Sequence, residues 1–313
     1  MAGSETGTGG GGPVSRSGGG GLRRYHEVRG WLFVAPYLVY VLVFFLFPMI
    51  WSLVLAWTDW NLISPVKEWT GMENFLEAFR SPRVRAAFVN TYRLMAVFVP
   101  VALVWSLILA LLLDRIPRGS ALFSVGYFLP YLASGVAVAL VVRGLIAYNS
   151  PINTFLRQRL GLDVAWLQHS TLALVIIALL IAWKFSGYFG LILLAGLRGI
   201  PRELYDAAEL DGATGWQKLR FITLPMLYPA FSSVLILAIA LTFGVFTEPY
   251  ILTKGGPDLA THTWHLEIYN QAFTSFRAGY ASAVAVLSAL ATFSTIGVVR
   301  WILQKWGNRY DPI

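Results

Sequence analysis

The chain has 313 residues, of which 57% are hydrophobic and only 13% are charged, and its formal net charge at pH 7 is +8. Soluble domains carry roughly 25% charged residues, so this composition indicates an integral membrane protein. Cysteine is absent, which excludes disulfides, thiolate nucleophiles, cysteine-based zinc sites and iron–sulfur clusters. We attribute the positive charge to basic residues that flank membrane spans, and expect no nucleic-acid partner.

The N-terminal residues 1–24 are predicted to form a disordered cytoplasmic tail, ahead of a membrane domain at 25–313. Residues 1–21 are rich in glycine and serine and have almost no apolar side chains, so they cannot bury a core. They also lack the short apolar segment and the small-residue cleavage site of a signal peptide. We therefore expect this tail to be retained.

Six apolar runs are long enough to cross a bilayer, which takes about 20 residues of helix. They lie at roughly 31–57, 92–113, 121–147, 170–197, 226–250 and 278–302. The first run has no charged residue, whereas the fourth contains Lys184. The sequence therefore predicts an all-α integral membrane protein with six transmembrane helices.

The lysines and arginines between these runs predict an orientation. With the N-terminus in the cytoplasm, the inside segments carry 13 of them and the outside segments carry 9. Cytoplasmic loops of membrane proteins carry the excess of basic residues. An even number of spans leaves both ends of the chain on one side, so we expect both termini in the cytoplasm.

Between the fourth and fifth runs lies a charged, helix-prone segment, PRELYDAAELDGATGWQKLRFITLP, at Pro201–Pro225. Proline is tolerated in the first turn of a helix, because its missing N–H would have no partner there. Glu203 and Asp206 lie near the N-terminus, where the helix dipole favours negative charge. Gly212 and Gly215 are typical of a helix end or bend. The segment therefore predicts a short helix along the cytoplasmic face.

The catalytic motifs that the sequence could carry are missing. It has neither the G-x-x-x-x-G-K-[ST] loop that holds nucleotide phosphates nor an H-E-x-x-H zinc motif. His262 and His265 lie close together in a predicted outer loop, but two histidines are a weak metal signal, and we interpret them as polar loop residues. We expect no metal site, no ATP hydrolysis by this chain and no enzymatic activity.

The charged segment closely resembles the cytoplasmic loop of binding-protein-dependent ABC importer permeases. Their pattern is E-A-A, three residues, G, nine residues, I, and then L-P after a short gap. Here Asp206-Ala207-Ala208 stands for E-A-A, Gly212 follows, and Ile222 and Leu224-Pro225 close the pattern. The one departure is aspartate in place of glutamate at 206, which shortens the side chain and keeps its charge.

Other segments resemble the carbohydrate-importing branch of that family, the maltose and glycerol-3-phosphate type. They are WTDWNL after the first run, FLPYLASGVAVALV in the third, LLAGLRGIP before the charged segment, YILTKGGP after the fifth run and GYASAVAVL at the start of the sixth. The resemblance covers about residues 25–306. It implies the type I ABC importer permease fold, in the cell (inner) membrane of a bacterium or archaeon.

The resemblance also implies partners and a mechanism. Two related permeases form one pore, a soluble binding protein delivers the solute outside, and a cytoplasmic ATPase dimer binds ATP and Mg²⁺, so this chain itself holds no cofactor. The loop helix enters a cleft on the ATPase and transmits its movement to the pore. The residues that the resemblance assigns to this coupling are Glu203, Asp206, Ala207, Ala208, Asp211 and Gly212.

Polar and ionisable groups inside spans are costly and are therefore candidates for a substrate pathway. The fourth run offers Trp183, Lys184 and Tyr188, and the fifth offers Thr242 and Glu248. In maltose-type permeases a tyrosine at the position of Tyr188 contacts sugar. Packing between helices, with each hydroxyl satisfied, is the alternative for Tyr188 and Thr242, and Lys184 and Glu248 can pair with each other or face a water-filled path.

Two other classes of protein have six spans. An intramembrane enzyme would need acids or histidines converging at one depth, which the runs do not offer. An ion-coupled secondary carrier would show an internal repeat and discontinuous spans, and it has no use for the charged segment. The sequence therefore favours a non-catalytic permease subunit that imports a sugar, polyol or glycerol phosphate.

Overall fold

The computed structural model describes residues 31–64, 67–116 and 119–307. The tail predicted at 1–24 lies outside these residues, and the division into tail and membrane domain stays a prediction. The chain divides into two units, Met1–Ser52 and Leu53–Ile313. The described residues are almost entirely helical, which confirms the predicted all-α class.

The first predicted span is one helix from Trp31 to Leu55. It contains a π-helical turn, η1 (Leu42–Leu46), followed by α2 (Phe47–Leu55). Pro48 accounts for this turn, because a proline ring crowds the preceding turn and lacks the N–H that would bond there. Nearly all of the helix's side chains are apolar and exposed, as expected of a helix that lies in lipid.

A small hairpin and a short helix open the second unit. β1 (Thr58–Asp59) pairs antiparallel with β2 (Glu68–Trp69), and α3 (Glu73–Arg80) follows. The Asn74 amide donates to two backbone carbonyls in and just before β1, at 2.9 and 3.1 Å. These bonds attach α3 to the hairpin.

Three continuous helices confirm the predicted second, fourth and sixth spans: α4 (Pro82–Asp114), α8 (Ser170–Arg198) and α15 (Ala278–Gly307). The first of them begins before the predicted run at 92–113. Ser81 caps its N-terminus by accepting from the Val84 amide, and Pro82 occupies its first turn.

The predicted third and fifth spans are bent. The third consists of α5 (Ser120–Leu132) and α6 (Gly135–Leu145), which meet at 88° across the extended Ala133 and Ser134. In the fifth, a helical stretch from Gly215 to Met226 (α10, η2 and α11) meets α12 (Tyr228–Phe243) at 67°. The predicted fifth run, 226–250, also ends early, since α12 stops at Phe243 and a separate helix, α13 (Thr247–Leu252), follows. Within the described residues, four helices are long and apolar enough to cross a membrane, and counting each bent pair as one span raises the number to six.

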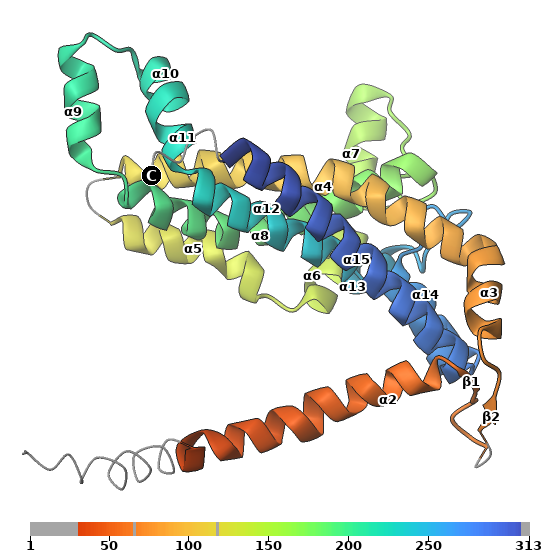
Figure 1. Ribbon diagram of the computed structural model, residues 1–313. Helices are drawn as coiled ribbons and strands as arrows, with labels where there is room; N and C mark the ends of the chain where they lie inside the picture. Colours follow the sequence, from red (N-terminus) through yellow and green to blue (C-terminus); the bar gives the residue numbers. More distant parts are fainter. Residues whose placement is uncertain (1–30, 65–66, 117–118, 308–313) are drawn as a thin grey trace, which may run out of the picture. The chain divides into compact units, whose positions relative to one another are not determined.

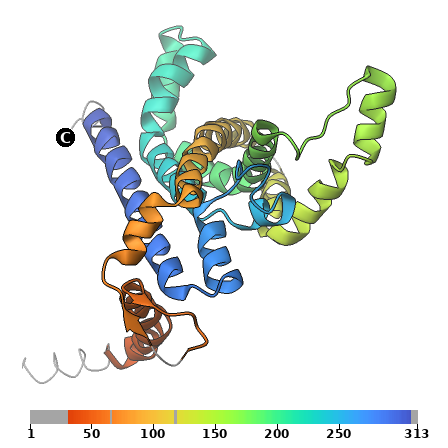
Figure 2. The same cartoon turned by 90° about the vertical axis from the view of Figure 1, so that its right-hand side faces the viewer.

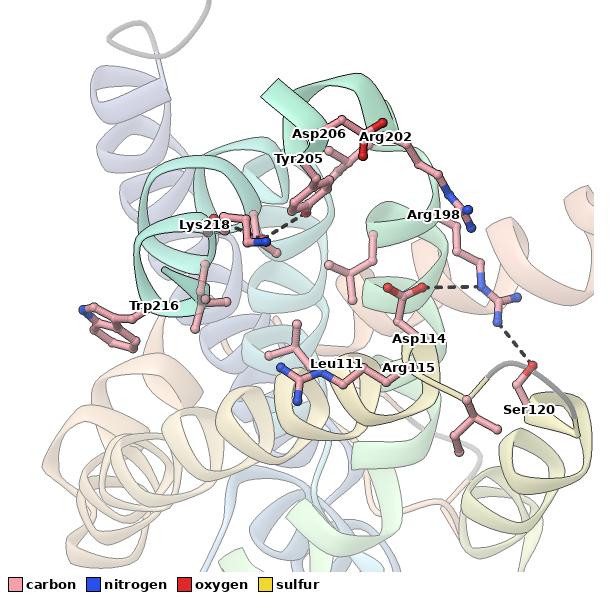
Figure 3. A pocket seen from close by; sticks show the side chains of 16 residues that line it. Leu111, Asp114, Arg115, Ser120, Arg198, Arg202, Tyr205, Asp206, Trp216 and Lys218 are labelled. Atoms are coloured by element: carbon pink, nitrogen blue, oxygen red, sulfur yellow. Dashed lines mark hydrogen bonds and ion pairs between the residues drawn. The ribbon is translucent and has the colours of Figure 1, made fainter. Parts of the chain in front are cut away.

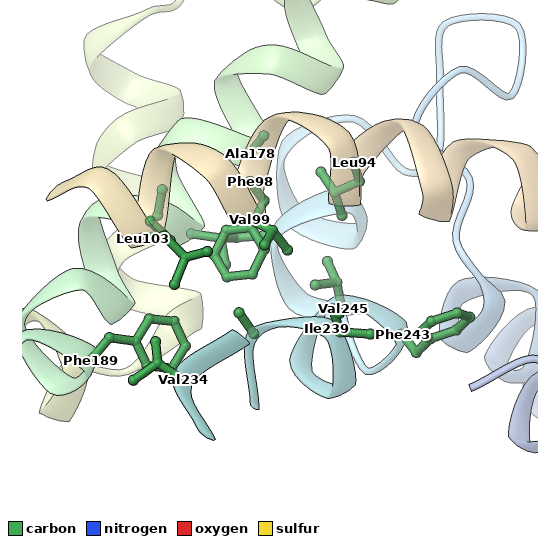
Figure 4. Close-up of a cluster of buried hydrophobic side chains, with 14 of the residues drawn as sticks. Leu94, Phe98, Val99, Leu103, Ala178, Phe189, Val234, Ile239, Phe243 and Val245 are labelled. Atoms are coloured by element: carbon green, nitrogen blue, oxygen red, sulfur yellow. The ribbon is translucent and has the colours of Figure 1, made fainter. Parts of the chain in front are cut away.

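The core of the second unit lies where α4, α8 and α12 pack together (Figure 4). Its largest fully buried side chains include Phe98, Phe189 and Phe243, one from each helix. Lipid is as apolar as leucine, so helices in a membrane associate through close packing at small residues. Gly187 of α8 is such a residue: a Cβ there would lie 1.8 Å from a backbone oxygen of α5.

The two ends of the second unit differ in character (Figure 1). At one end, α9 (Arg202–Leu210) and α10 (Gly215–Lys218) project beyond the spans, as the turned view in Figure 2 also shows. At the other end lie α3, β1 and β2 and the connection from α13 to α14 (Trp264–Tyr269) and η3 (Asn270–Thr274). A further helix, α7 (Pro151–Leu160), connects α6 to α8.

The connection before α15 is held by buried polar groups. His262 Nε2 lies 2.7 Å from a Glu267 carboxylate oxygen, and Gln271 donates to the other oxygen at 2.8 Å. Burial alone would raise the pKa of Glu267, but these hydrogen bonds outweigh it and lower the pKa. The network fixes α14 and η3 relative to the loop before them.

Candidate functional site

The charged segment forms the predicted short helix, α9, and a well-defined turn after it. The N–H of Gly212 donates to the Glu209 carbonyl at 3.0 Å, and that of Ala213 to the Ala208 carbonyl at 2.8 Å. This pair of bonds is a Schellman motif, which needs a left-handed residue at its centre. Gly212 supplies it with φ +73°, so the glycine of the family pattern has a backbone reason to be there.

Most of the residues predicted for coupling lie on the solvent side of α9. Glu203, Asp206, Ala207, Asp211 and Gly212 are exposed, and Ala208 is half-buried. Tyr205 points the other way, toward the rest of the segment. The structure therefore presents the predicted residues on one accessible surface, and their role in coupling stays a prediction.

Leu210 belongs to the same surface and was missed at the level of sequence. It stands three and four residues after Ala207 and Asp206, which places all three on one side of the helix. Its side chain is 90% exposed, which is unusual for leucine at the end of a polar helix. A search for apolar residues on the exposed side of the helix, as well as on the side that faces the core, would have identified Leu210.

Side-chain bonds fasten α9 to the helix that follows it. The Tyr205 hydroxyl lies 2.9 Å from the Thr223 hydroxyl, and Lys218 Nζ lies 2.5 Å from Glu209. The hydrogen bond from Lys218 lowers the pKa of Glu209. Thr214 and Gln217 cap α10 reciprocally. Together these contacts allow α9 and α10 to move as one piece.

A cavity of about 1210 Å³ lies beneath α9, between it, α10 and the ends of α4 and α8 (Figure 3). Its walls carry Asp206 and Arg202 from α9 and Asp114 and Arg115 from the end of α4. Arg198, the last residue of α8, lies 3.9 Å from the Asp114 carboxylate, and it also donates to Ser120 Oγ at 3.3 Å. The ends of the second, third and fourth spans are thus tied together directly under α9.

Two of the predicted pathway residues form an ion pair inside the membrane region. Lys184 lies midway along α8, and its Nζ is 3.9 Å from a Glu248 carboxylate oxygen at the start of α13. The two side chains are only 12% and 9% exposed. A charge at this depth is costly unless it is paired, so the pairing accounts for both residues.

The bend of the third span touches this pair. A Cβ built on Gly135, the first residue of α6, would lie 3.0 Å from Lys184 Nζ and 3.5 Å from a Glu248 oxygen. Farther along α6, Arg143 donates to the Ile251 carbonyl of α13 at 3.2 Å. The breaks after α5 and after α12 therefore meet at one ion pair. Sequence reasoning missed Gly135, because a glycine in an apolar run carries no signal of its contacts.

The other predicted pathway residues are not gathered around the pair. Thr242 is fully buried and donates to the Ala238 carbonyl one turn back. Tyr188 stacks on Tyr131 of α5, with ring centres 4.7 Å apart and an interplanar angle of 12°. Trp183 is 46% exposed and lines an apolar groove between α6 and α8. Whether any of them contacts a solute stays a prediction.

Within the described ranges, no group of three or more histidine, aspartate or glutamate side chains is placed to hold a metal ion. His262 is buried against Glu267, and His265 Nδ1 lies 2.8 Å from the Phe243 carbonyl. Both histidines thus have protein partners.

Comparisons with known proteins agree with this arrangement. Residues 75–308 match the family described as binding-protein-dependent transport system inner membrane component. A probable ABC transporter permease protein of Pyrococcus horikoshii is 31% identical over 262 residues, covering 83% of this chain and 90% of that protein. The lactose transport system permease protein LacF of Rhizobium radiobacter is 33% identical over 283 residues, covering 87% of this chain and 94% of LacF.

A solved structure shares the fold. A chain of a bacterial alginate ABC transporter, crystallised with an alginate pentasaccharide-bound periplasmic protein, superposes with a TM-score of 0.79 at 22% identity, covering 91% of this chain and 97% of that one. At this identity the match concerns the fold alone. With the family match and the relatives, it leads to one conclusion: the chain belongs to the binding-protein-dependent inner membrane components, and it is an ABC transporter permease subunit that crosses the membrane several times.

Proposed function

We propose that this chain forms half of the translocation pore of an ATP-driven importer for a sugar or sugar-like solute, such as an oligosaccharide, polyol or glycerol phosphate. The observation that carries the coupling proposal is the surface of α9, where Asp206, Ala207 and Leu210 are all exposed, with Asp206 at the edge of the cavity beneath the helix. The names of two relatives support the solute class, since LacF is a lactose permease and MsmF of Streptococcus mutans belongs to a multiple sugar-binding transport system.

The proposed partners are those of the family. A second, homologous permease completes the pore, and an extracytoplasmic solute-binding protein delivers the solute. A cytoplasmic ATPase dimer binds ATP and Mg²⁺, so this chain holds no cofactor and catalyses no reaction. We place α9, and with it both termini, on the cytoplasmic side of the bacterial or archaeal cell membrane, because the segments on that side carry more basic residues.

The mechanism that we propose transmits movement along α8. This helix has no break between Lys184 and Arg198, a stretch of about 21 Å at 1.5 Å per residue. Arg198 lies just before α9 and is paired with Asp114, so a displacement of α9 by the ATPase would move the inner ends of α4 and α8 together. The middle of α8 carries the Lys184–Glu248 pair, which lies where α6 begins after the bend of the third span and where α13 begins after the end of α12.

This geometry suits alternating access. Discontinuous helices are also typical of ion-coupled carriers, because a break allows one half of a span to move without the other, so they support alternating access in general, and it is α9 that favours the importer. The substrate pathway would then pass near Lys184 and Glu248. Trp183, Tyr188 and Thr242 are not gathered around this pair, so their contact with the solute is a separate part of the proposal.

The decisive experiment measures ATPase docking. Asp206→Lys and Gly212→Asp should leave the chain inserted in the membrane but abolish both co-purification of the ATPase and solute uptake. Asp206→Lys reverses a charge on the proposed contact surface, and Gly212→Asp strains the left-handed turn and adds a carboxylate.

The chain offers matched controls. Gly161 ends α7 with φ +63°, so Gly161→Asp imposes the same backbone strain away from α9. Glu73→Lys reverses an exposed acid at the start of α3. Both controls should retain the ATPase. Normal co-purification of the ATPase with both test variants would refute the proposed coupling.

A further inference from the structure

An arginine cluster surrounds a cavity at the end of the molecule opposite to α9. Arg80, Arg85 and Arg93 line a space of about 520 Å³, and a single carboxylate, that of Asp258, accompanies them. All three arginines are exposed. Among residues 31–64, 67–116 and 119–307, none of the three forms an ion pair. The cavity therefore carries a net positive charge of two without a protein counter-ion in the described chain.

The cavity is held open by fixed backbone. Asn90, on the same side of α4, donates to the carbonyls of Leu259 and His262, at 2.5 and 3.1 Å. These bonds hold the loop that carries Asp258 against α4. The lining also includes the end of α3 and the first residue of α8, Ser170. A ligand would thus find walls made by three helices and one anchored loop.

The position of the cluster runs against the usual distribution of charge. In the orientation proposed above, these arginines lie on the outer side, where membrane proteins carry fewer basic residues than on the cytoplasmic side. α4 has 33 residues and is therefore about 50 Å long, whereas the hydrocarbon core is about 30 Å thick. About 20 Å of α4 therefore extends beyond the core, and the proposal places its first turns at the outer membrane surface, where lipid headgroups lie.

The side of α4 that carries the arginines continues into an apolar stripe. Counted at 100° per residue, Arg85 and Arg93 share a side of the helix with Ala96, Pro100 and Val104. These three apolar residues are exposed, Val104 by 55%. A basic cavity at the head of an exposed apolar stripe matches the form of a lipid, which has an anionic headgroup and apolar chains below it.

We propose that Arg80, Arg85 and Arg93 bind the phosphodiester of an anionic lipid headgroup in the outer leaflet, with the acyl chains along the stripe below. Guanidinium groups bind phosphate oxygens well because their N–H groups form a planar fork. Basic pockets between membrane helices bind anionic headgroups on the cytoplasmic side of membranes, and the same chemistry would apply to an anionic lipid of the outer leaflet. This proposal uses the orientation given above but does not depend on solute import.

The test titrates the purified full-length chain in detergent with phosphatidylglycerol, phosphatidylcholine or inorganic phosphate, and follows the thermal unfolding midpoint. Phosphatidylglycerol should raise the midpoint of the wild type, and the other two should not. A basic residue near a membrane surface contributes about 1 kcal/mol to anionic-lipid binding. Loss of one arginine should therefore weaken the apparent affinity about fivefold, and the double variant R85Q/R93Q on the order of thirtyfold.

Three controls accompany the titration. Arg159→Gln removes an exposed arginine from α7, away from the cavity, and should leave the lipid effect unchanged. Arg93→Lys keeps the charge but loses the guanidinium fork, and should weaken the apparent affinity less than Arg93→Gln does. Salt at about 1 M should suppress the rise in the wild-type thermal midpoint, because the Debye length falls to about 3 Å. This control uses the wild type alone and therefore does not depend on the folding of a variant.

The proposal is overturned by any of three results. One is an equal response to phosphatidylglycerol in R85Q/R93Q and in the wild type. Another is full stabilisation by inorganic phosphate alone, which would make this a site for free anions. The third is an unchanged lipid response with weakened capture of the solute-binding protein, which would assign the arginines to docking of that protein. None of these results bears on coupling to the ATPase.

Discussion

The Lys184–Glu248 pair allows a sharp test of what a buried charge contributes in this fold. Replacing Lys184 by methionine keeps the length of the side chain and leaves the Glu248 carboxylate without its partner. The carboxylate cannot reach water, because its side chain is only 9% exposed. Leucine in place of Glu248 creates the opposite defect, an unpaired ammonium in the middle of α8.

The distance between the two groups sets the expected size of the effect. Unit charges 3.9 Å apart attract each other by about 4 kcal/mol at an effective dielectric constant of about 20. Removing one partner of a buried pair costs about 3–5 kcal/mol, whereas replacing both by apolar groups is often neutral or stabilising. We therefore expect each single variant to lose about 3–5 kcal/mol, and the double variant to lie within about 1 kcal/mol of the wild type.

Equilibrium unfolding of the full-length chain in mixed detergent measures the loss of unfolding free energy for the two single variants and for the double variant. Arg157 and Asp163 provide the matched control, because they lie at a similar distance, 3.8 Å, but are 33% and 57% exposed. A pair so exposed should show a coupling below about 1 kcal/mol. If the double variant Lys184→Met/Glu248→Leu instead loses the sum of the two single losses, the charges do not stabilise each other and the pairing has no energetic role.

Three smaller predictions concern backbone fit and pH. Gly187→Ala places a Cβ 1.8 Å from a backbone oxygen of α5 and should cost about 1–3 kcal/mol or more, whereas Gly126→Ala meets open space and should leave the thermal midpoint nearly unchanged. Gly212→Ala strains a residue with φ +73° by about 1 kcal/mol, and hydrogen exchange should become faster at the end of α9 alone. The hydrogen bond from Arg277 lowers the pKa of Glu77. The stability that this pair contributes is therefore complete at a pH above the pKa of an ordinary carboxyl group, and it is lost as the pH falls through the lowered pKa of Glu77. Both side chains are about half exposed, so the loss should stay below about 1 kcal/mol, and Glu77→Gln should remove it from a thermal titration between about pH 6 and pH 2.

The apolar runs were sufficient to predict the number and class of the spans but not their shape. Hydropathy sums over a window, and 121–147 is predominantly apolar although its helix turns by 88° after Leu132. Pro130 is a local signal of that turn, yet membrane helices tolerate proline when neighbouring groups satisfy the backbone. Just after the bend, Gly135 packs against the side chains of Lys184, Thr247 and Glu248, which are distant in sequence and which hydropathy does not reveal.

The charged segment was easier to predict than the membrane site, and the reason is physical. Helix start, helix end and the left-handed turn at Gly212 depend on neighbours within a few residues, so the local pattern determines them. The partner of Lys184 is 64 positions away at Glu248, and an apolar run does not show which side of one helix contacts which side of another. The exposure of Leu210 was missed for a similar reason, since a leucine in a short helix is ordinarily assigned to a core.

The bent spans and the ion pair together suggest why the proposed coupling needs a long, unbroken α8. A break in this helix would absorb a displacement of α9 locally, whereas an intact helix carries it to Lys184. At that depth the neighbouring elements are interrupted, α5 from α6 and α12 from α13, so they can respond to the movement by changing an angle rather than by unfolding. Gly135, which leaves room for Lys184 Nζ, permits the two interrupted elements to close on one charge pair. In the proposed mechanism the physical roles are thus divided: the unbroken α8 would carry movement from α9 to Lys184, and the interrupted elements beside it would yield to that movement there.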